Sequence, residues 1–450
     1  MPYFSAQVLN WLSLILKERF GQSFTLTQPQ NSLKLTLVNS EQGHILFPKL
    51  EDAFHQSSSD FPCAYWEATK EGWVSVLGQP LVAPCVHELP VQLIEYQADH
   101  AVIHYDILGL TYWMLNRIEE IGRKDLDNHE RFPAIHSHAY KYDYLERPIV
   151  DEWLYVLGQV IEKVWPNIKL KQHQFSMKVS HDVDSPSLYQ FKSWKTIIRM
   201  MGGHLLKRHD LKSFFQSPYI KVTAGSRLHN QDPHNTFDWL MDVSEVNNLT
   251  SAFYFICGRT SELDADYEPE NQAIKNLIKK MHERGHEIGL HPSYNTYQTP
   301  ELIKQEADQL RQVLQEEGIE QPMLGGRMHY LRWQHPTTLQ AWNDAGMTYD
   351  TTLSYADRPG FRCGTCFEYP AFNPTTQQQL DIRVRPLIAM ECTVIAERYM
   401  NLGCTQEAIA KFLELKNKCQ KVSGCFTLLW HNSHFNSNED KQIYQKIIES

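Results

Sequence analysis

Hydrophobic and polar positions follow two different patterns along the chain. Residues 1–170 contain short β-rich runs and one longer helical stretch, and the amphipathic pattern of the first 20 residues predicts a helix there. The β-rich runs are residues 23–28, 33–38 and 73–78, and the helical stretch is 106–122. Short runs of this kind with helices indicate a small α+β domain of unknown role, in which we find no catalytic arrangement of side chains.

From Met177 onward the pattern changes to short strands separated by helices. The predicted strands are residues 177–184, 251–258, 286–291, 323–331, 347–355, 387–395 and 425–432. One helix between them has an apolar stripe of Ala273, Ile274, Leu277, Ile278 and Met281 and ends at Gly285. Another starts at Pro300, which suits a first helical position, and ends at Gly318.

This alternation of strands and helices predicts a parallel sheet. Seven repeats favour a (β/α) barrel over an open sheet, so we expect an α/β fold with a seven-stranded barrel over residues 171–450, after the smaller α+β domain of 1–170. In such a barrel, catalytic groups lie where strands end and loops begin.

Composition places the chain among ordinary globular proteins. The 450 residues are 42% hydrophobic and 21% charged, and the formal charge of −10 with a pI near 6.1 argues against a general nucleic-acid binder. No basic segment precedes the apolar stretch at the N-terminus, and no run reaches the roughly 20 apolar residues of a membrane span. We therefore expect a cytoplasmic protein without a membrane span.

Cysteine and histidine usage adds little chemistry outside the predicted strand ends. The nine cysteines lack the spacing of a disulfide framework, and Cys363 and Cys366 form a CxxC without the second pair that a four-cysteine zinc site needs. We interpret these two as reduced thiols in a loop. His129, His136 and His138 lie in a polar, Pro-bounded segment and are expected to be solvated loop residues.

The strongest chemical signal lies at the end of the first barrel strand. Asp182 and Asp184 are two residues apart, so in a strand they share one face, and Pro186 ends the strand. Two carboxylates this close repel unless a cation compensates or one keeps its proton. A metal with one carboxylate as ligand and the other as general base resolves the repulsion. The alternative is a solvated turn with a helix-capping Asp.

Histidines end two further predicted strands. His291 is followed by Pro292 and, at the fourth position, by Asn295, and one tight turn would bring both side chains to one metal. A structural hydrogen-bonding histidine is the alternative for His291. His431 ends an apolar strand near the C-terminus, where a partly buried imidazole suits a general acid, and His434 follows in the next loop.

These motifs together resemble those of the NodB-homology polysaccharide deacetylases, which are carbohydrate esterases with a distorted (β/α) barrel. The first motif of that family pairs a base Asp with a metal-ligand Asp, and His181-Asp182-Val183-Asp184 resembles its spaced version. The second motif is a His followed at the fourth position by another His, which here is His291 followed by Asn295. The resemblance implies that Asp182 is the base and that Asp184, His291 and Asn295 face a metal.

The other family motifs have counterparts as well. The third begins with an Arg that pairs with the base, and Arg327 in Gly-Arg-Met-His-Tyr matches it. The fourth supplies an acidic residue that orients the catalytic His, for which Asp350 is the first choice and Asp357 the second. The fifth is Leu-x-His, here ending in His431, which the resemblance makes the acid that protonates the departing amine.

The resemblance implies a divalent metal, with zinc as the expected ion. An Asn amide is a weaker zinc ligand than an imidazole, so affinity or metal preference is expected to shift, or His286, His434 or water replaces the missing ligand. The implied reaction is hydrolysis of the N-acetyl group of a sugar in a bacterial surface polysaccharide or its precursor. Aromatic side chains that can stack on a sugar or belong to the core are Tyr294, Tyr330, Trp333 and Tyr355.

Two other functions use the same residues. One is a metal amidohydrolase acting on an amide that is not a carbohydrate, and the other is a catalytically silent sugar-binding protein, which the Asn at position 295 favours. Residues 1–170 resemble an uncharacterised domain that precedes deacetylase domains in bacterial surface-polysaccharide gene clusters, and such a domain would present substrate or cover the barrel.

Overall fold

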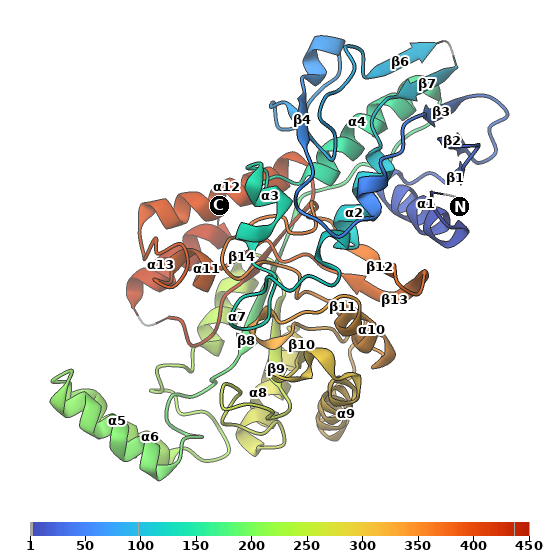
Figure 1. Cartoon of the computed structure of the whole chain (residues 1–450). Helices are drawn as coiled ribbons and strands as arrows, with labels where there is room; N and C mark the ends of the chain where they lie inside the picture. The colour runs from blue at the N-terminus through green and yellow to red at the C-terminus, as the bar shows by residue number, and fades with distance from the viewer. Residues whose placement is uncertain (1–2, 98, 436, 450) are drawn as a thin grey trace.

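The computed structural model describes residues 3–97, 99–435 and 437–449 of a mixed α/β protein. The N-terminal region contains a five-stranded sheet in the order β1-β2-β3-β7-β6 and a separate β4-β5 ribbon, flanked by helices (Figure 1). Its strands are β1 (Phe24–Thr27), β2 (Leu33–Leu37), β3 (His44–Phe47), β4 (Cys63–Trp66), β5 (Leu81–Pro84), β6 (Ile94–Gln97) and β7 (His100–Ile103). Its helices are α1 (Ala6–Phe20), α2 (Ile107–Leu115), α3 (His138–Lys141) and α4 (Ile149–Val164).

Most elements predicted for this region are confirmed, and one is wrong. Strands β1 and β2, helix α1, and α2 with a 3-10 turn at Ile118–Glu120 lie where the pattern places them. Residues 73–78 form no strand. The backbone N–H and C=O of Val74 are hydrogen-bonded to the side-chain amide of Gln159, which takes the place of a neighbouring strand.

Two bridged sheets form the centre of the C-terminal region. A parallel sheet has the order β10-β9-β8-β15-β14, and a mixed sheet has the order β11-β13-β12. The strands are β8 (Ser176–Val183), β9 (Ser251–Ile256), β10 (Glu287–His291), β11 (Tyr349–Asp350), β12 (Tyr369–Asn373), β13 (Gln378–Val384), β14 (Ala389–Met390) and β15 (Cys425–Leu429). Six of the seven expected strands are present, as β8, β9, β10, β11, β14 and β15, whereas β12 and β13 were not predicted. The predicted strand at 387–395 is wrong beyond Met390, because Glu391–Ile395 form helix α11. The described strands form two bridged sheets, and the expected closed barrel is not confirmed.

The predicted strand at 323–331 is reduced to a single bridging residue. Gly326 pairs with Leu290 on one side and with Asp350 on the other, and so connects the two sheets. A Cβ at this position would lie 1.8 Å from the carbonyl oxygen of Leu290, so only glycine permits this approach. After Gly326 the chain turns into the loop that carries Arg327 and His329.

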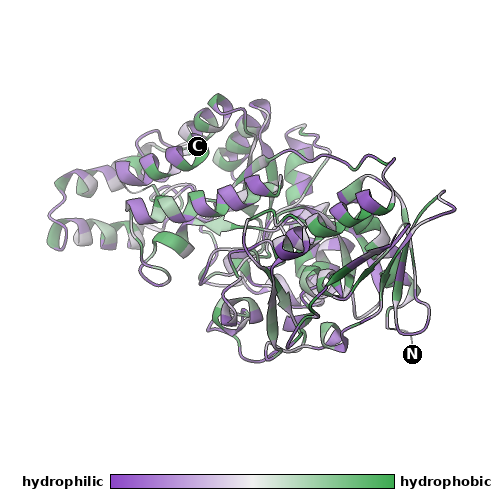
Figure 2. Cartoon of the chain, turned by 90° about the horizontal axis from the view of Figure 1, so that it is seen from above, coloured by the Kyte–Doolittle hydropathy of each residue, from purple (hydrophilic) through white to green (hydrophobic). Residues whose placement is uncertain are grey.

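Helices cover the sheets, and the two helices read from the sequence are confirmed. The buried residues of α8 (Gln272–Glu283) are the five of the predicted stripe, and α9 (Pro300–Glu316) has Pro300 in its first turn. Hydrophobic and hydrophilic residues alternate around the helical turns (Figure 2). The other helices are α5 (Trp194–Leu206), α6 (Leu211–Thr223), α7 (Phe237–Val246), α10 (Thr337–Asp344), α11 (Glu391–Ile395), α12 (Gln406–Lys421) and α13 (Asn438–Glu449).

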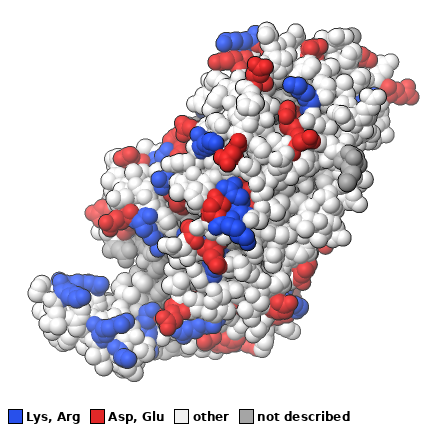
Figure 3. Space-filling model, in the orientation of Figure 1, with Lys and Arg blue, Asp and Glu red and all other residues white. Residues whose placement is uncertain are grey.

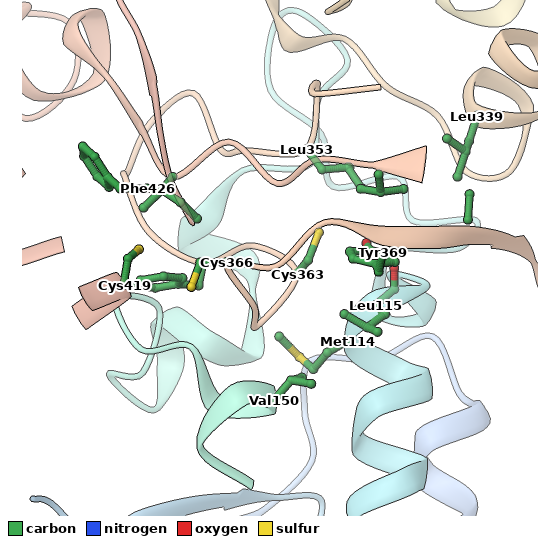
Figure 4. Close-up of a cluster of buried hydrophobic side chains, with 14 of the residues drawn as sticks. Met114, Leu115, Val150, Leu339, Leu353, Cys363, Cys366, Tyr369, Cys419 and Phe426 are labelled. Atoms are coloured by element: carbon green, nitrogen blue, oxygen red, sulfur yellow. The ribbon is translucent and has the colours of Figure 1, made fainter. Parts of the chain in front are cut away.

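One hydrophobic core runs through both regions. Met114 and Val150 of the N-terminal helices lie beside Cys363, Cys366 and other residues of the C-terminal region (Figure 4). Both cysteines are buried free thiols, and the backbone N–H of Cys366 donates a hydrogen bond to the Asp151 carboxylate (3.0 Å). Along the described parts of the chain, no helix has the length and apolar character that crossing a membrane requires.

Candidate metal-binding active site

The carboxyl ends of the parallel strands bring the predicted site residues together. Asp182 lies in β8, His291 ends β10, and His431 follows the end of β15. Strands β8 and β15 are direct neighbours, and β9 lies between β8 and β10. Because parallel strands end at the same edge of a sheet, side chains far apart in sequence meet there.

Three side chains converge in a group that we call the metal triad: Asp184, His291 and His329. Oδ1 of Asp184 lies 3.2 Å from Nε2 of His291 and 3.7 Å from Nε2 of His329. These three ligand atoms all lie within 4.8 Å of one another. In a tetrahedral zinc site with bonds of about 2.0 to 2.3 Å, ligand atoms are roughly 3.3 to 3.7 Å apart, so the spacing suits such an ion.

Hydrogen bonds on the far side of each ring fix which nitrogen faces the triad. Nδ1 of His291 donates to the backbone oxygen of Arg327 (2.6 Å), and Nδ1 of His329 donates to Oδ1 of Asp264 (2.9 Å). In the neutral ring the proton is then on Nδ1, and Nε2 presents a lone pair. This is the arrangement of a metal-binding histidine held by a second residue.

Two buried atoms of the triad have no hydrogen-bond partner among the described residues: Nε2 of His291 and Oδ1 of Asp184. A lone pair facing a carboxylate oxygen is stabilised by a cation between them. Burial raises the pKa of Asp184, but the imidazoles of His329, His291 and His431 outweigh it and hold that pKa well below its ordinary value. The residues present therefore fit a divalent metal with mixed nitrogen and oxygen ligands.

Asn295 lies outside this group, contrary to the prediction. Its exposed amide donates to the backbone oxygen of Thr260 (2.8 Å) and accepts from Arg332 (3.1 Å). His286, one alternative, contacts the backbone N–H of Ser251 and the Glu245 carboxylate instead. The third ligand of the triad is instead His329, which the sequence reasoning missed although its spacing of two from Arg327 repeats that of Asp182 and Asp184.

Asp182 lies beside the triad and forms a buried ion pair. Its Oδ1 accepts from Nη1 of Arg327 (2.7 Å), and Nη2 of Arg327 donates to the Ser180 hydroxyl (2.8 Å). Oδ2 of Asp182 lies 3.7 Å from Nε2 of His291. The pairing expected between Asp182 and Arg327 is therefore present, with one carboxylate oxygen directed toward the triad.

His431 belongs to a second group, the Glu391 cluster: Glu391, Cys392, His431 and His434. Oε1 of Glu391 accepts from Nδ1 of His431 (2.5 Å) and from Nδ1 of His434 (2.7 Å). The Sγ of Cys392 lies 3.2 Å from Nδ1 of His434. Nε2 of His431 points the other way and lies 3.6 Å from Oδ2 of Asp184, so this ring connects the cluster to the triad.

The charges of the Glu391 cluster favour protonated imidazoles. Burial lowers the pKa of His431, but the Glu391 carboxylate and Cys392 outweigh it and raise that pKa well above its ordinary value. Burial likewise lowers the pKa of His434, whereas Cys392 and Glu391 raise it to about 9. The pKa of Glu391 itself is held low, because its two imidazole neighbours outweigh the effect of burial.

The two acidic residues expected to orient His431 lie elsewhere. The contacts of the buried Asp350 carboxylate are with the backbone N–H and hydroxyl of Thr352, and burial raises its pKa to about 6. Asp357 accepts from the backbone N–H of Ala134. Glu391 has taken the position beside His431 because β14, which it follows, is the direct neighbour of β15.

A pocket of about 290 Å³ opens above both groups, near the lower end of the range of roughly 300 to 1,000 Å³ for small-molecule sites. Its wall includes Tyr330, Arg398 and Tyr399 beside the catalytic candidates. Tyr330 has a left-handed backbone (φ 60°), and its carbonyl oxygen accepts from Arg131 (2.8 Å). Trp333 and Tyr355 are core residues, and Tyr294 is half-buried against His129.

The N-terminal region contributes to the rim of this pocket. Arg131 lines it and also donates to the Tyr399 hydroxyl (3.3 Å). Of the three histidines expected to be solvated, His136 is exposed and His129 half-buried, but His138 is fully buried. The prediction for His138 is wrong because its Nδ1 is hydrogen-bonded to the Tyr144 hydroxyl (2.6 Å) inside the core.

Comparisons with known proteins leave the family open. Residues 3–166 match a family of unknown function, DUF7033, and a search of curated proteins finds no match. Among solved structures, the chain is similar to a protein named as a polysaccharide deacetylase from Mycobacterium smegmatis, with 13% identity, a TM-score of 0.40, and coverage of 62% of this chain and 84% of that one.

Two further structures are similar to about the same degree. Puue allantoinase has 12% identity, a TM-score of 0.37, and coverage of 63% of this chain and 85% of that one. A protein named as a polysaccharide deacetylase from Pseudomonas aeruginosa PAO1 has 12% identity, a TM-score of 0.36, and coverage of 62% and 84%. Similarities this low assign neither a family nor an activity to the chain.

Proposed function

We propose that this protein is a metal-dependent hydrolase that removes N-acetyl groups from a sugar of a bacterial surface polysaccharide or its precursor. The observation that carries the proposal is the pair of buried atoms of the metal triad, Nε2 of His291 and Oδ1 of Asp184, which face each other without a hydrogen-bond partner among the described residues. A site of this kind, placed beside a paired Asp and a protonated His, suits the hydrolysis of an amide.

Asp184, His291 and His329 would hold the metal, with zinc as the ion that best suits this ligand set. When bound there, a divalent metal supplies Lewis-acid polarisation of a carbonyl and lowers the pKa of water. Arg327 holds Asp182 through Oδ1, which leaves Oδ2 to accept the proton of the attacking water.

His431 then acts as the general acid. Its Nδ1–H is held by Glu391, so Nε2 is the atom that faces the pocket and donates a proton to the leaving amine. Donation from the protonated ring turns the amine into a better leaving group, and the negative Glu391 stabilises the charged ring before transfer. Asp182 and His431 thus work as a base and an acid on the two sides of the scissile bond.

The proposal of a carbohydrate substrate rests on the motif residues that do meet at the site and on the wall of the pocket. Those residues are Asp182, Asp184, His291, Arg327 and His431. Tyr330 and Tyr399 present aromatic surfaces of the kind that stack on sugar rings, and the volume suits a single sugar residue better than a folded peptide. His329 supports an active protein over a silent one, because Asp184, His291 and His329 offer three candidate ligands without Asn295.

Acetate release from N-acetylated oligosaccharides tests the proposed function. We expect release that disappears on treatment with a chelator and returns on addition of zinc. Absence of metal-dependent release from every glycan tried would overturn the carbohydrate assignment, and release from a non-carbohydrate amide under the same conditions would replace it with an amidohydrolase.

A further inference from the structure

Helices α5 and α6 form a hairpin that projects away from the body of the protein (Figure 1). We call residues 194–223 the α5–α6 arm. Its helices pack together through Ile197 and Ile220, which form a small buried cluster with Tyr189, separate from the main core. The arm therefore holds itself together and contributes little to the stability of the two sheets.

The outer faces of the arm are apolar. Eight of the twenty large hydrophobic side chains that are exposed in the described chain belong to these thirty residues, at 39% to 75% exposure. They are Trp194, Ile198, Leu205, Leu206, Leu211, Phe215, Tyr219 and Val222. Their spacings of three, four and seven place most of them on one stripe of each helix, as in helices that bury an apolar face against a partner.

The arm is also strongly basic in an acidic protein. It contains six Lys and Arg residues and one Asp, a formal charge of +5 in a chain whose total is −10. They are Lys195, Arg199, Lys207, Arg208, Lys212 and Lys221. Within the parts of the chain that the structure describes, none of the six forms an ion pair with a carboxylate, and the arm shows blue side chains in Figure 3 where the body is mixed.

Apolar stripes flanked by unpaired basic residues match one partner chemistry, which is an anionic lipid surface. Lys and Arg bind the headgroups while Trp, Phe and Leu side chains enter the boundary of the acyl chains. A second copy of the arm would bring two charges of +5 together. A nucleic acid would satisfy the basic residues but leave the aliphatic side chains in water.

In the sequence, the arm follows shortly after one residue of the metal triad. It begins ten residues after Asp184, and the connection is clamped by Asp232, which accepts from the Ser187 hydroxyl (2.5 Å) and the backbone N–H of Leu188 (2.8 Å). This clamp lies between the arm and β8, the strand that carries Asp182 and ends directly before Asp184.

We propose that the α5–α6 arm docks the protein on an anionic membrane surface, so that its substrate is an acetamido sugar carried on a membrane lipid. The proposed membrane docking is inferred from the α5–α6 arm alone. The proposed lipid-carried substrate rests on the proposed function. The protein approaches the membrane as a peripheral enzyme.

Vesicle flotation with the full chain tests the docking. We expect binding to vesicles of phosphatidylcholine with phosphatidylglycerol, weak binding to phosphatidylcholine alone, and loss of binding at high salt. The combined changes Lys195→Glu, Arg199→Glu and Lys212→Glu are expected to weaken binding at least about tenfold. The changes Ile198→Ser, Leu206→Ser and Phe215→Ser are expected to weaken it as much at low salt.

Val91→Ser with Val246→Ser is the matched control, because both valines are exposed and lie outside the arm. Equal binding by the wild type and both arm variants, or no binding to anionic vesicles, would overturn the docking. The docking would also be overturned if light scattering showed a dimer that the variant with Ile198→Ser, Leu206→Ser and Phe215→Ser no longer forms. Preference for a nucleic acid over vesicles would overturn it as well.

An activity comparison separates this inference from the proposed function. Arm variants are expected to lose deacetylation of a sugar lipid presented on vesicles and to keep that of a soluble N-acetylated oligosaccharide. If the wild type floats with vesicles as Asp184→Ala does, and the wild type deacetylates no sugar, the docking holds and the proposed function fails. Equal loss on both substrates would overturn the lipid-carried substrate.

Discussion

The two sides of the pocket are built from the same kinds of side chain, yet their atoms are spaced differently. In the metal triad, one carboxylate oxygen lies 3.2 and 3.7 Å from two imidazole nitrogens. In the Glu391 cluster, one carboxylate oxygen lies 2.5 and 2.7 Å from two imidazole nitrogens. The first spacing leaves room for an ion between the atoms, and the second is that of hydrogen bonds.

The orientation of the rings explains the difference. In the triad, Nδ1–H of each ring donates a hydrogen bond to an acceptor outside the triad, either the backbone oxygen of Arg327 or the Asp264 carboxylate. The lone pair on Nε2 of each ring therefore faces the Asp184 carboxylate. In the Glu391 cluster, Nδ1–H of each ring faces the carboxylate directly. His and carboxylate residues at strand ends therefore hold a metal or a proton according to which nitrogen the surrounding structure presents.

The largest effect is expected from His329→Ala. Loss of one of two imidazoles removes the metal, and with it several kcal/mol of transition-state stabilisation, so activity falls at least about a thousandfold. Zinc content after gel filtration and acetate release measure the change. Asn295→Ala is the control and keeps both its zinc and its activity. If Asn295→Ala lost zinc and His329→Ala kept it, the ligands would instead be Asp184, His291 and Asn295, as predicted from the sequence.

Asp182→Asn is expected to separate catalysis from metal binding. Without a proton acceptor, activity falls by roughly 10²- to 10⁴-fold, while zinc stays bound because the triad is intact. Zinc content and acetate release are measured on the same sample. Activity close to that of the wild type would rule out Asp182 as the base.

Glu391→Gln tests whether the Glu391 cluster keeps His431 protonated. The Glu391 carboxylate raises the pKa of His431 against burial, so its removal lowers that pKa and the ring loses its proton at a lower pH. We expect kcat to fall about a hundredfold at neutral pH and the alkaline limb of its pH profile to move to lower pH. Asp350→Asn, a buried carboxylate without contact to His431 among the described residues, is the control and leaves the limb in place.

Asp264→Asn weakens the second residue behind His329. Asp264 accepts from Nδ1 of His329 and from the backbone N–H of Tyr294, and an amide oxygen holds the ring less firmly. Losses of 10- to 100-fold in metal affinity are typical of such partners, and competition with a chelator of known affinity measures them. Unchanged affinity would mean that Asp264 does not position His329.

The smallest effect is expected from Cys392→Ser. If the Glu391 cluster holds protons rather than a metal, replacing its thiol leaves the zinc content of the wild type unchanged. Metal analysis of the two proteins, with Cys404→Ser as a control thiol outside both groups, decides this. A lower zinc content in Cys392→Ser alone would show that both sides of the pocket bind metal.

Much of the local structure was predictable because it depends on near neighbours in sequence. Asp182 lies in β8 and Asp184 directly follows its last residue, and both carboxylates approach Nε2 of His291, as the predicted alternation requires. The apolar runs before His291 and His431 predict strands that the structure confirms. The strand predicted at 73–78 is absent because the backbone of Val74 is hydrogen-bonded to the side chain of Gln159, more than eighty residues away.

The sequence by itself determined where the chemistry sits, at the ends of strands that carry Asp, His and Arg. The tertiary structure decided which of these residues meet. Glu391 reaches His431 because β14 and β15 pair in parallel, and His329 joins the triad because Gly326 bridges two sheets. Pairing between strands dozens of residues apart depends on register and on close approach of backbones, and neither leaves a periodic signal in a single sequence.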